Sequence, residues 1–524
     1  MPRGCGLSQR EVTAQLAQTK SELQYLLSQI IVNVKDYGAK GDGEIDDTES
    51  IQEAIDYVHD KGGGSVLIPK GRYMIKSHGE TAVPFNYLRY TGGIHVKSGV
   101  RLIMHRETVL KAIPHSYRGS NVIRVTSQDD VVILGGVVEG ERYEHDFDSG
   151  DDHITQEFNY GIFIHGSSNV RIENVITKDH HGDGINIQID NDTVCSNVHI
   201  KNVVSTNNHR QGMSIEGLIG GVVENSTFKN TNGTTPEAGV DIEPWSDENP
   251  VENVVFRDCV FENNNGSGLV VMGKGIKNIS VDYSILTGNK DQNGDLALFY
   301  GKDFSITNSV IGNKIVITEW LNSFIHGNQF QVILFNNALD TVVDSNRIVY
   351  TDRPSWLTSI EMIVVADYAG KKNGTRNLTL SNNYILGHLT SRSSYVGYGI
   401  RIESGRDITI KDNYMQRVNE MIWSESDQMT ITGNRFVNCG SPLGVRGNSW
   451  LINDNVFEGM NVIAVENMAI KNSYDKANSV IINNVTFRRP RDVYNRLEFA
   501  EYISSTTLNN VNAEKHIHNI HVNN

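Results

Sequence analysis

The sequence between residues 159 and 273 reads in part NYGIFIHG (159–166), GDGINIQID (182–190), RQGMSIEG (210–217), EAGVDIEPW (237–245) and GSGLVVMG (266–273). Each stretch contains a glycine followed by alternating apolar and polar residues. These glycines are Gly161, Gly184, Gly212, Gly239 and Gly268, so they recur every 23 to 29 residues. Repetition at this period is typical of a solenoid, in which each repeat forms one coil. We therefore expect a repeat fold and not a single globular core.

The alternation within each repeat assigns side chains to the two faces of a strand. The apolar residues after each glycine are expected to point into the solenoid, and the residues between them to point outward. Aligned on the glycines, the outward columns read Phe163, Asn186, Ser214, Asp241, Val270 and His165, Gln188, Glu216, Glu243, Met272. We expect three carboxylates, those of Glu216, Asp241 and Glu243, to converge on one exposed face.

Composition supports one long domain with terminal pieces. The chain has 524 residues, more than one compact core normally covers, but a solenoid grows linearly and escapes that limit. Apolar content is 38% and there are 48 glycines, which suits short strands and turns better than thick helical layers. The net charge of −15 without a block of basic residues argues against a nucleic-acid partner.

Cysteine spacing and hydropathy exclude some classes of protein. The four cysteines, Cys5, Cys195, Cys259 and Cys439, lie far apart and are expected to be free thiols that ligate no metal. Residues 1–16 contain no apolar signal-peptide core, and the chain has no run of about 18 apolar residues. We expect neither a signal peptide nor a membrane span, so action outside a cell would require another route of release, such as lysis.

Residues 8–31 carry a seam of apolar positions spaced alternately four and three residues apart. A capping box, Ser8 with Glu11, precedes the seam. The seam residues are Val12, Leu16, Thr19, Leu23, Leu26 and Ile30. This pattern predicts a short coiled coil that mediates self-association, and residues 1–31 are interpreted as an attachment segment. The alternative is one amphipathic helix lying on the domain.

Residues 32–75 contain DYGAKGDG (36–43), DDTESIQEAI (46–55) and GGGSVLIPKGRY (62–73). These pieces resemble the opening of the pectate-lyase-like right-handed parallel β-helix superfamily, as found in bacteriophage tailspikes and pre-neck appendages. The resemblance implies an all-β fold with a cap at residues 32–90, a parallel β-helix at 91–490 and a tail at 491–524. An open solenoid end needs such a cap. We expect Asp47 or Thr48 to begin a helix that covers the first rung with Ile51, Ala54, Ile55 and Val58.

A second repeat pattern follows between residues 377 and 457: NLTLSNNYI, DITIKDNYM, QMTITGNRF and SWLINDNVF. One column of this pattern contains Asn346, Asn383, Asn413, Asn434 and Asn455. Asn tolerates the left-handed bend between strands, and its amide can bond to the next rung. We predict a structural ladder. The histidines near the C-terminus are interpreted as part of an exposed terminal strand, with a metal site as the alternative.

The carboxylate cluster predicts glycoside hydrolysis. Rungs are separated by about 4.8 Å, which would place the carboxyl groups of Glu216, Asp241 and Glu243 roughly 5 to 7 Å apart. Close pairs favour a retaining mechanism and wider pairs an inverting one, and both remain open. Stacked like charges also raise one pKa and so keep a general acid protonated. The alternative is a solvated acidic face in a chain with 62 acidic residues.

Several neighbours are candidates for binding substrate. Trp245 would stack on a sugar ring, His209 and Arg210 lie at the turn into the Glu216 rung, and His165 shares the outward column of Glu216. Asp183 opens the GDG turn, although it and Trp245 also suit plain turn roles. The polar insertion at 140–158 resembles a His/Asp-rich loop of phage β-helix proteins, which makes Glu157 a further candidate. Its Asp146, Asp148, Asp151 and Asp152 offer a Ca²⁺ alternative without EF-hand spacing; otherwise no cofactor or metal is expected.

The combined interpretation is a homotrimeric, tailspike-like depolymerase of the phage virion that hydrolyses a bacterial surface polysaccharide or teichoic acid. Phage tail proteins would be its partners through the N-terminus. Polygalacturonases share the fold, but Asn191-Asp192-Thr193 and Gly182-Asp183-Gly184 only echo their motifs, and Gln211 replaces the expected His. The rival interpretations are a lyase, an epimerase, a teichoic-acid phosphodiesterase and a non-catalytic receptor-binding spike.

Overall fold

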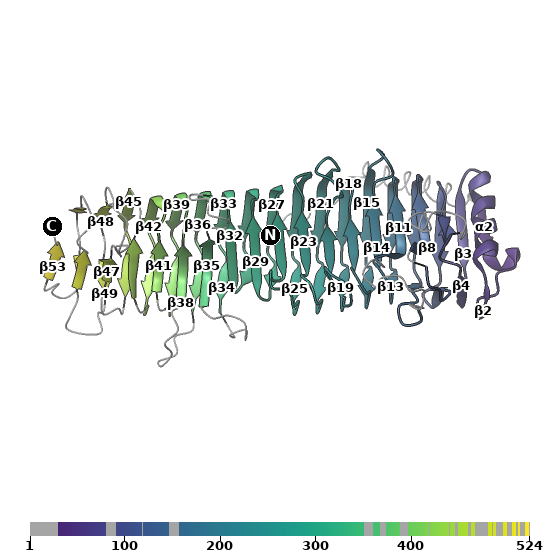
Figure 1. Cartoon of the computed structure of the whole chain (residues 1–524), viewed down its shortest axis with the longest axis horizontal. Helices are drawn as coiled ribbons and strands as arrows, with labels where there is room; N and C mark the ends of the chain where they lie inside the picture. The colour runs from purple at the N-terminus through teal and green to yellow at the C-terminus, as the bar shows by residue number, and fades with distance from the viewer. Residues whose placement is uncertain are drawn as a thin grey trace, which may run out of the picture.

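The chain winds into a long solenoid of parallel strands, as a computed structural model shows (Figure 1). The structure describes residues 30–79, 91–117, 119–145, 157–350, 360–366, 374–387, 397–418, 420–439, 441–445, 449–458, 463–466, 480–484, 486–488, 496–499, 506–509, 512–513 and 519–522. Residues 8–29 of the coiled coil predicted at 8–31, and the aspartates of the 140–158 insertion, lie outside these ranges.

Each coil contributes one strand to each of three parallel sheets. The first sheet runs from β1 (Ile30–Asn33) to β51 (Thr506–Asn509), and the second from β2 (Asp42–Asp46) to β52 (Asn512–Ala513). The third contains β5 (Ile94–His95), β8 (Gly119–Thr126), β11 (Phe158–His165), β14 (Ile185–Gln188), β17 (Met213–Ile215), β20 (Val240–Ile242), β23 (Leu269–Met272), β26 (Leu296–Phe299), β29 (Lys314–Thr318), β32 (Val332–Asn336), β35 (Ile360–Ala366), β38 (Gly397–Ile402), β41 (Glu420–Ser424), β44 (Ser441–Val445), β47 (Ile463–Glu466), β50 (Arg496–Phe499) and β53 (Asn519–Val522). The predicted parallel β-helix is confirmed.

The predicted register of the repeats is also confirmed. Along the third sheet, Ile162, Ile185, Met213, Val240 and Leu269 lie opposite one another on successive strands. All five side chains are fully buried. They form one stacked row of the core, which runs the length of the solenoid because each coil places its apolar residue directly above the last.

The repeat glycines are required by close approach between coils. A Cβ at Gly212 would lie 2.3 Å from the carbonyl oxygen of Gly239. The backbone of Gly212 also takes part in the pairing, since its N–H donates to the oxygen of Ala238 at 3.1 Å. Any larger residue would push the two coils apart, which explains why a glycine starts each repeat.

Helix α2 (Thr48–Asp60) covers one end of the solenoid, as predicted (Figure 1). Its buried residues are Ile51, Ala54, Ile55 and Val58, the four that the sequence indicated. Asp47 precedes the helix but makes no side-chain cap; its carboxylate instead accepts hydrogen bonds from the N–H groups of Lys40 and Gly41, at 2.5 and 2.9 Å. These bonds fold the η1 (Val34–Tyr37) to β2 connection against the helix start.

The predicted boundaries need correction at both ends of the solenoid. Strand β1 begins at Ile30, which had been assigned to the coiled coil, and it pairs with β3 (Gly64–Ile68). Coils are therefore already present in the segment predicted to be only a cap. At the other end, β50 pairs in parallel with both β47 and β53, so coils continue beyond residue 490.

The asparagine ladder is confirmed. Asn346, Asn383, Asn413 and Asn434 each donate from the side-chain amide to the side-chain oxygen of the next member, at 2.9 to 3.0 Å. All five members, including Asn455, are buried. The left-handed backbone falls one residue earlier than expected, for example at Asn382 and Asp412. The ladder residues therefore supply hydrogen bonds, and their neighbours supply the bend.

Three of the four cysteines lie within the described residues. Cys195, Cys259 and Cys439 are free and buried. Within the described ranges, no helix is both long enough and apolar enough to cross a membrane.

Candidate active site

The predicted outward column forms on strands β14, β17 and β20 of the third sheet. Asn186 lies opposite Ser214, and Ser214 lies opposite Asp241. The side chains point away from the apolar core, as expected. They are not exposed, however: only 2% of Asp241 and 6% of Glu216 is accessible. The expectation of an exposed acidic face is wrong because side chains from β11 and from the turn after β20 cover the cluster.

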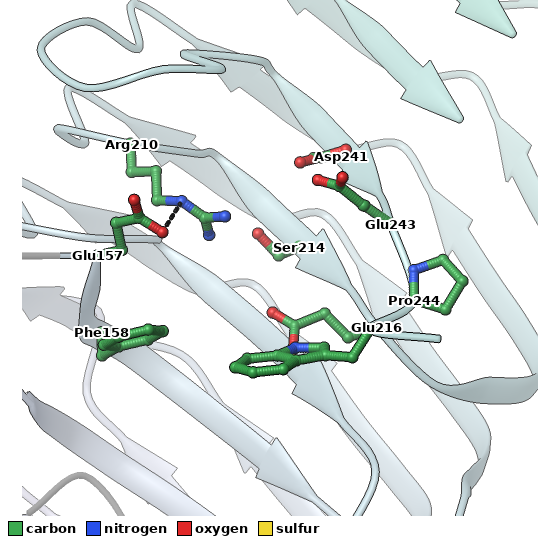
Figure 2. Close-up of a pocket in the computed structure, with 9 residues that line it drawn as sticks. Glu157, Phe158, Arg210, Ser214, Glu216, Asp241, Glu243 and Pro244 are labelled. Carbon is green, nitrogen blue, oxygen red and sulfur yellow. Dashed lines mark hydrogen bonds and ion pairs between the residues drawn. The ribbon is translucent and has the colours of Figure 1, made fainter. Parts of the chain in front are cut away.

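The cluster lines an open cavity of about 260 Å³ (Figure 2). The residues lining it are Glu157, Phe158, Arg210, Ser214, Glu216, Asp241, Glu243, Pro244 and Trp245. The first two reach it from the start of β11, and the last three follow β20 directly. Six of the nine predicted site residues thus meet in one cavity. A protein wall around charged groups lowers the local dielectric and strengthens their interactions.

Asp241 is a deeply buried acid in the cavity wall. Its Oδ2 accepts a hydrogen bond from Nε2 of Gln211 at 2.8 Å. Within the part of the chain that the structure describes, no group hydrogen-bonds to Oδ1. Burial, reinforced by the neighbouring charge of Glu243, raises the pKa of Asp241 from 3.8 to about 8. Asp241 is therefore a neutral acid at pH 7.

Glu243 lies beside Asp241 in the cavity wall (Figure 2). It is half-buried, whereas Asp241 is almost fully buried. The two carboxyl groups therefore lie in different environments. This difference suits Asp241 to the role of acid and Glu243 to the role of base or nucleophile.

Glu216 is held by three donors. Asn186 Nδ2 donates to Oε1 at 2.9 Å, Gln188 Nε2 donates to Oε2 at 2.8 Å, and the indole N–H of Trp245 also donates to Oε2. Burial raises the pKa of Glu216 although these hydrogen bonds oppose the shift. Trp245 remains 61% exposed, so the bond to Glu216 fixes an indole ring at the cavity mouth.

Arg210 and Asp183 form a buried ion pair in the floor of the site. Arg210 Nη1 lies 3.2 Å from Asp183 Oδ2, and Ser214 Oγ donates to the same oxygen at 2.8 Å. Arg210 Nε lies 3.5 Å from Glu157 Oε2 (Figure 2). Burial raises the pKa of Asp183 even beside Arg210. The Arg210 charge is thus shared between two carboxylates from different coils.

Besides Asp183, which lies behind Arg210, two further predicted substrate contacts lie outside the cavity wall. His165 stacks on Phe163 with ring centroids 5.0 Å apart, and its Nδ1 lies 3.8 Å from Asp190 Oδ2. His209 stacks on His181 at 4.6 Å. Neither residue is among those lining the cavity.

Sequence reasoning missed four residues that shape the site. Phe158 and Pro244 line the cavity, and their apolar character gave no chemical signal. Ser214 stood in the aligned column between Asn186 and Asp241, so its position was available from the register. Gln211 was noted only as a departure from a polygalacturonase motif, yet it is the donor to Asp241.

Comparison with known proteins places the chain by fold. Residues 31–85 match the family described as rhamnogalacturonase A/epimerase, pectate lyase-like. Residues 148–315 match the right-handed beta helix region. The solenoid is a right-handed parallel β-helix. The resemblance of the opening residues to the pectate-lyase-like superfamily is thereby confirmed.

Three similar proteins illustrate the extent of the likeness. The uncharacterized protein YclG of Bacillus subtilis (strain 168) is 27% identical over 446 residues, which cover 78% of this chain and 74% of YclG. Alginate lyase 7 of Azotobacter vinelandii is 42% identical over 83 residues, 16% of this chain and 9% of that protein. The pre-mature gene product 12 of bacteriophage phi29 has a TM-score of 0.50 at 14% identity, covering 96% of this chain and 74% of that structure. The last likeness concerns the fold alone.

Proposed function

We propose that this protein hydrolyses a polysaccharide, with Asp241 as the general acid and Glu243 as the second carboxylate. The observation that carries the proposal is the contrast between the two groups. Asp241 is buried and its pKa of about 8 keeps it protonated, while Glu243 is half-buried beside it in the same cavity. Glycoside hydrolysis uses such a pair, one carboxyl group that donates a proton and one that is ionised.

The chemistry assigns one step to each group. Asp241 donates its proton to the glycosidic oxygen as the bond to the anomeric carbon breaks. Glu243 either activates the water that attacks that carbon or attacks it directly, and the choice between inversion and retention depends on the separation of the two carboxyl groups in the complex. Both routes end with a new reducing end. In the inverting route Glu243 takes a proton from the attacking water, and exchange with solvent then restores the proton of Asp241; in the retaining route the ionised Asp241 takes its proton from the water that hydrolyses the glycosyl-enzyme.

The remaining residues of the cavity suit the binding of a sugar. The exposed indole of Trp245, fixed by Glu216, offers a flat apolar surface to a pyranose ring. Glu157 and Arg210 supply polar groups on the opposite wall. Glu216, with both oxygens accepting hydrogen bonds, serves to position Trp245 and not to transfer protons.

We place this activity on a bacterial surface polysaccharide or cell-wall glycopolymer, in a phage tailspike-like homotrimer attached through residues 1–31. The resemblance of the motifs in residues 36–73 to the opening of phage β-helix proteins supports this setting. The match to the rhamnogalacturonase A/epimerase family and the local similarity to alginate lyase 7 support a polysaccharide substrate. Light scattering of the full chain tests the assembly, since a trimer has three times the mass of the 58.3 kDa chain.

A second candidate function is elimination or epimerisation of a uronic acid polymer. Arg210 in the cavity wall favours it, because such chemistry needs a cation to neutralise the substrate carboxylate. Against it, the Arg210 charge is already shared between Asp183 and Glu157.

Incubation with a panel of capsular and cell-wall polymers, followed by mass spectrometry of the fragments, tests the proposal. Hydrolysis yields fragments that carry the added mass of water, whereas elimination yields unsaturated fragments without it. The double variant Asp241→Asn with Glu243→Gln is the matched control and should release nothing. If the wild type and this variant both bind a polymer equally and neither cleaves it, the protein is a receptor-binding spike.

A further inference from the structure

A second cluster of ionisable side chains lies outside the lining of the cavity. It comprises His115, Glu141 and His145, whose ligand atoms all lie within 4.8 Å of one another. Glu141 Oε1 is 2.8 Å from His145 Nδ1 and 3.3 Å from His115 Nε2. All three residues are buried, and only 2% of Glu141 is accessible.

The cluster joins two successive coils. His115 follows β7 (Thr108–Ala112), while Glu141 and His145 follow β10 (Val137–Glu139), which pairs with β7. Glu141 and His145 are four residues apart on one short segment, so the fold of this segment places both side chains at the cluster. The segment starts the 140–158 insertion, whose other end supplies Glu157 and Phe158 to the cavity.

We propose that His115, Glu141 and His145 bind a divalent transition-metal ion of the Zn²⁺ class. Two imidazoles and one carboxylate are a common donor set for Zn²⁺ and its neighbours, and the nitrogen donors disfavour Ca²⁺ and Mg²⁺. A tetrahedral ion with bonds of about 2.0 Å to nitrogen and oxygen has ligand-to-ligand edges of about 3.3 Å. The His115 to Glu141 edge already has this length, and the His145 to Glu141 edge needs to open by about 0.5 Å.

The surroundings supply a closed site. The ring of His181 lies parallel to that of His145, with centroids 4.3 Å apart, and walls off one side. Ser77 Oγ lies 3.1 Å from His115 Nε2 and is positioned for the fourth ligand or for a hydrogen bond to a bound water. Burial of this kind fits a structural ion that ties the two coils together, and a dication compensates the charge of the buried Glu141 carboxylate.

Metal binding has one local cost. The N–H of Tyr117 donates to His115 Nδ1 at 3.1 Å, so the neutral ring carries its proton on Nε2. Coordination through Nε2 moves that proton to Nδ1, and the Tyr117 bond is then lost. The rival description is a metal-free cluster in which both imidazoles donate to Glu141, and the experiment must separate the two.

The test is a titration of the full-length, EDTA-dialysed protein with Zn²⁺, followed by calorimetry and by metal analysis of the desalted protein. We expect one tightly bound Zn²⁺ per chain and a higher melting temperature with Zn²⁺ than without. Glu141→Gln and His145→Ala should each weaken binding at least about 100-fold and abolish the thermal shift. Co²⁺ bound in place of Zn²⁺ should show the visible absorption of a tetrahedral site, and circular dichroism should show that each variant is folded.

The matched control is His326→Gln. His326 Nδ1 lies 3.0 Å from Asp344 Oδ2, on coils distant from the cluster. Because His326 has no part in the cluster, this variant should bind Zn²⁺ like the wild type. All variants keep the histidines near the C-terminus, so binding there does not distinguish them. A wild type that binds no stoichiometric Zn²⁺, or a Glu141→Gln variant that binds it equally well, would overturn the proposal in favour of the metal-free cluster.

Discussion

Gln211 Nε2 donates a hydrogen bond of 2.8 Å to Asp241 Oδ2 across two neighbouring coils. The amide holds the carboxyl group in one orientation without supplying a positive charge. Asp241 is therefore fixed in place and still protonated, since burial and the charge of Glu243 dominate its pKa. A His at position 211, as in the polygalacturonase motif, would add a titratable cation and favour the ionised form of Asp241.

The first prediction concerns the pH dependence of polymer cleavage. If Asp241 donates the proton, kcat/KM should fall as the pH rises through about 8, because the acid then loses its proton. Initial rates measured across the range of pH 5 to about 10 check this. A rate that stays constant through the alkaline range would remove Asp241 from the role of acid.

The second prediction concerns stability. Folding raises the pKa of Asp241 from 3.8 to about 8, so between these values the folded chain binds more protons than the unfolded chain. Its contribution to the free energy of unfolding is therefore fully present below pH 3.8 and is lost as the pH rises toward 8. Asp241→Asn cannot ionise, so its melting temperature relative to wild type should increase with pH over this window. A difference between the two that is independent of pH would contradict the burial argument.

The third prediction separates the two roles of Trp245. Trp245→Ala should raise KM by about 10-fold, since both the stacking surface and the bond to Glu216 are lost. Trp245→Phe keeps an aromatic face and loses only the N–H, so it should recover much of the affinity. Steady-state kinetics on the cleaved polymer compare the variants. Equal KM values for all three proteins would mean that substrate does not contact the indole.

The origin of the site illustrates what sequence alone can predict. Glycine spacing and alternation were enough to align Asn186, Ser214 and Asp241, because a parallel solenoid converts sequence period directly into spatial register. The side chains that cover the column of Asn186, Ser214 and Asp241 were not predictable. Phe158 begins β11 at the end of the 140–158 insertion, and Trp245 lies in the connection after β20. No periodic rule states where insertions and connections of irregular length fold. The pKa shift of Asp241 was therefore expected from charge repulsion, whereas burial is its larger cause.

The second cluster was missed for a similar reason. His115 and Glu141 lie on connections between strands, outside any repeat alignment, and only the fold brings them together. The capping helix was easier to predict from the sequence, because Ile51, Ala54, Ile55 and Val58 lie on one helical face within a single short segment.

The fourth prediction tests the asparagine ladder. Asn413 donates to the backbone oxygen of Leu380 at 2.9 Å and exchanges hydrogen bonds with the ladder residues above and below. Asn413→Ala leaves these buried groups unpaired and should lower the free energy of unfolding by about 1–3 kcal/mol. Denaturant titration measures it, with Thr409→Ala as a half-buried control on the same coil. A cost no larger than that of the control would mean that the ladder is dispensable. Cleavage by the folded variant should be unchanged, since Asn413 lies outside the cavity lining.

The central claim, hydrolysis by Asp241 and Glu243, is tested most directly by cleaving the polymer in water enriched in ¹⁸O and weighing the fragments. The account predicts one ¹⁸O atom in each new reducing end, and at least about 100-fold less product from Asp241→Asn at an unchanged fold. Unsaturated fragments without the label, or equal labelled product from Asp241→Asn, would contradict it.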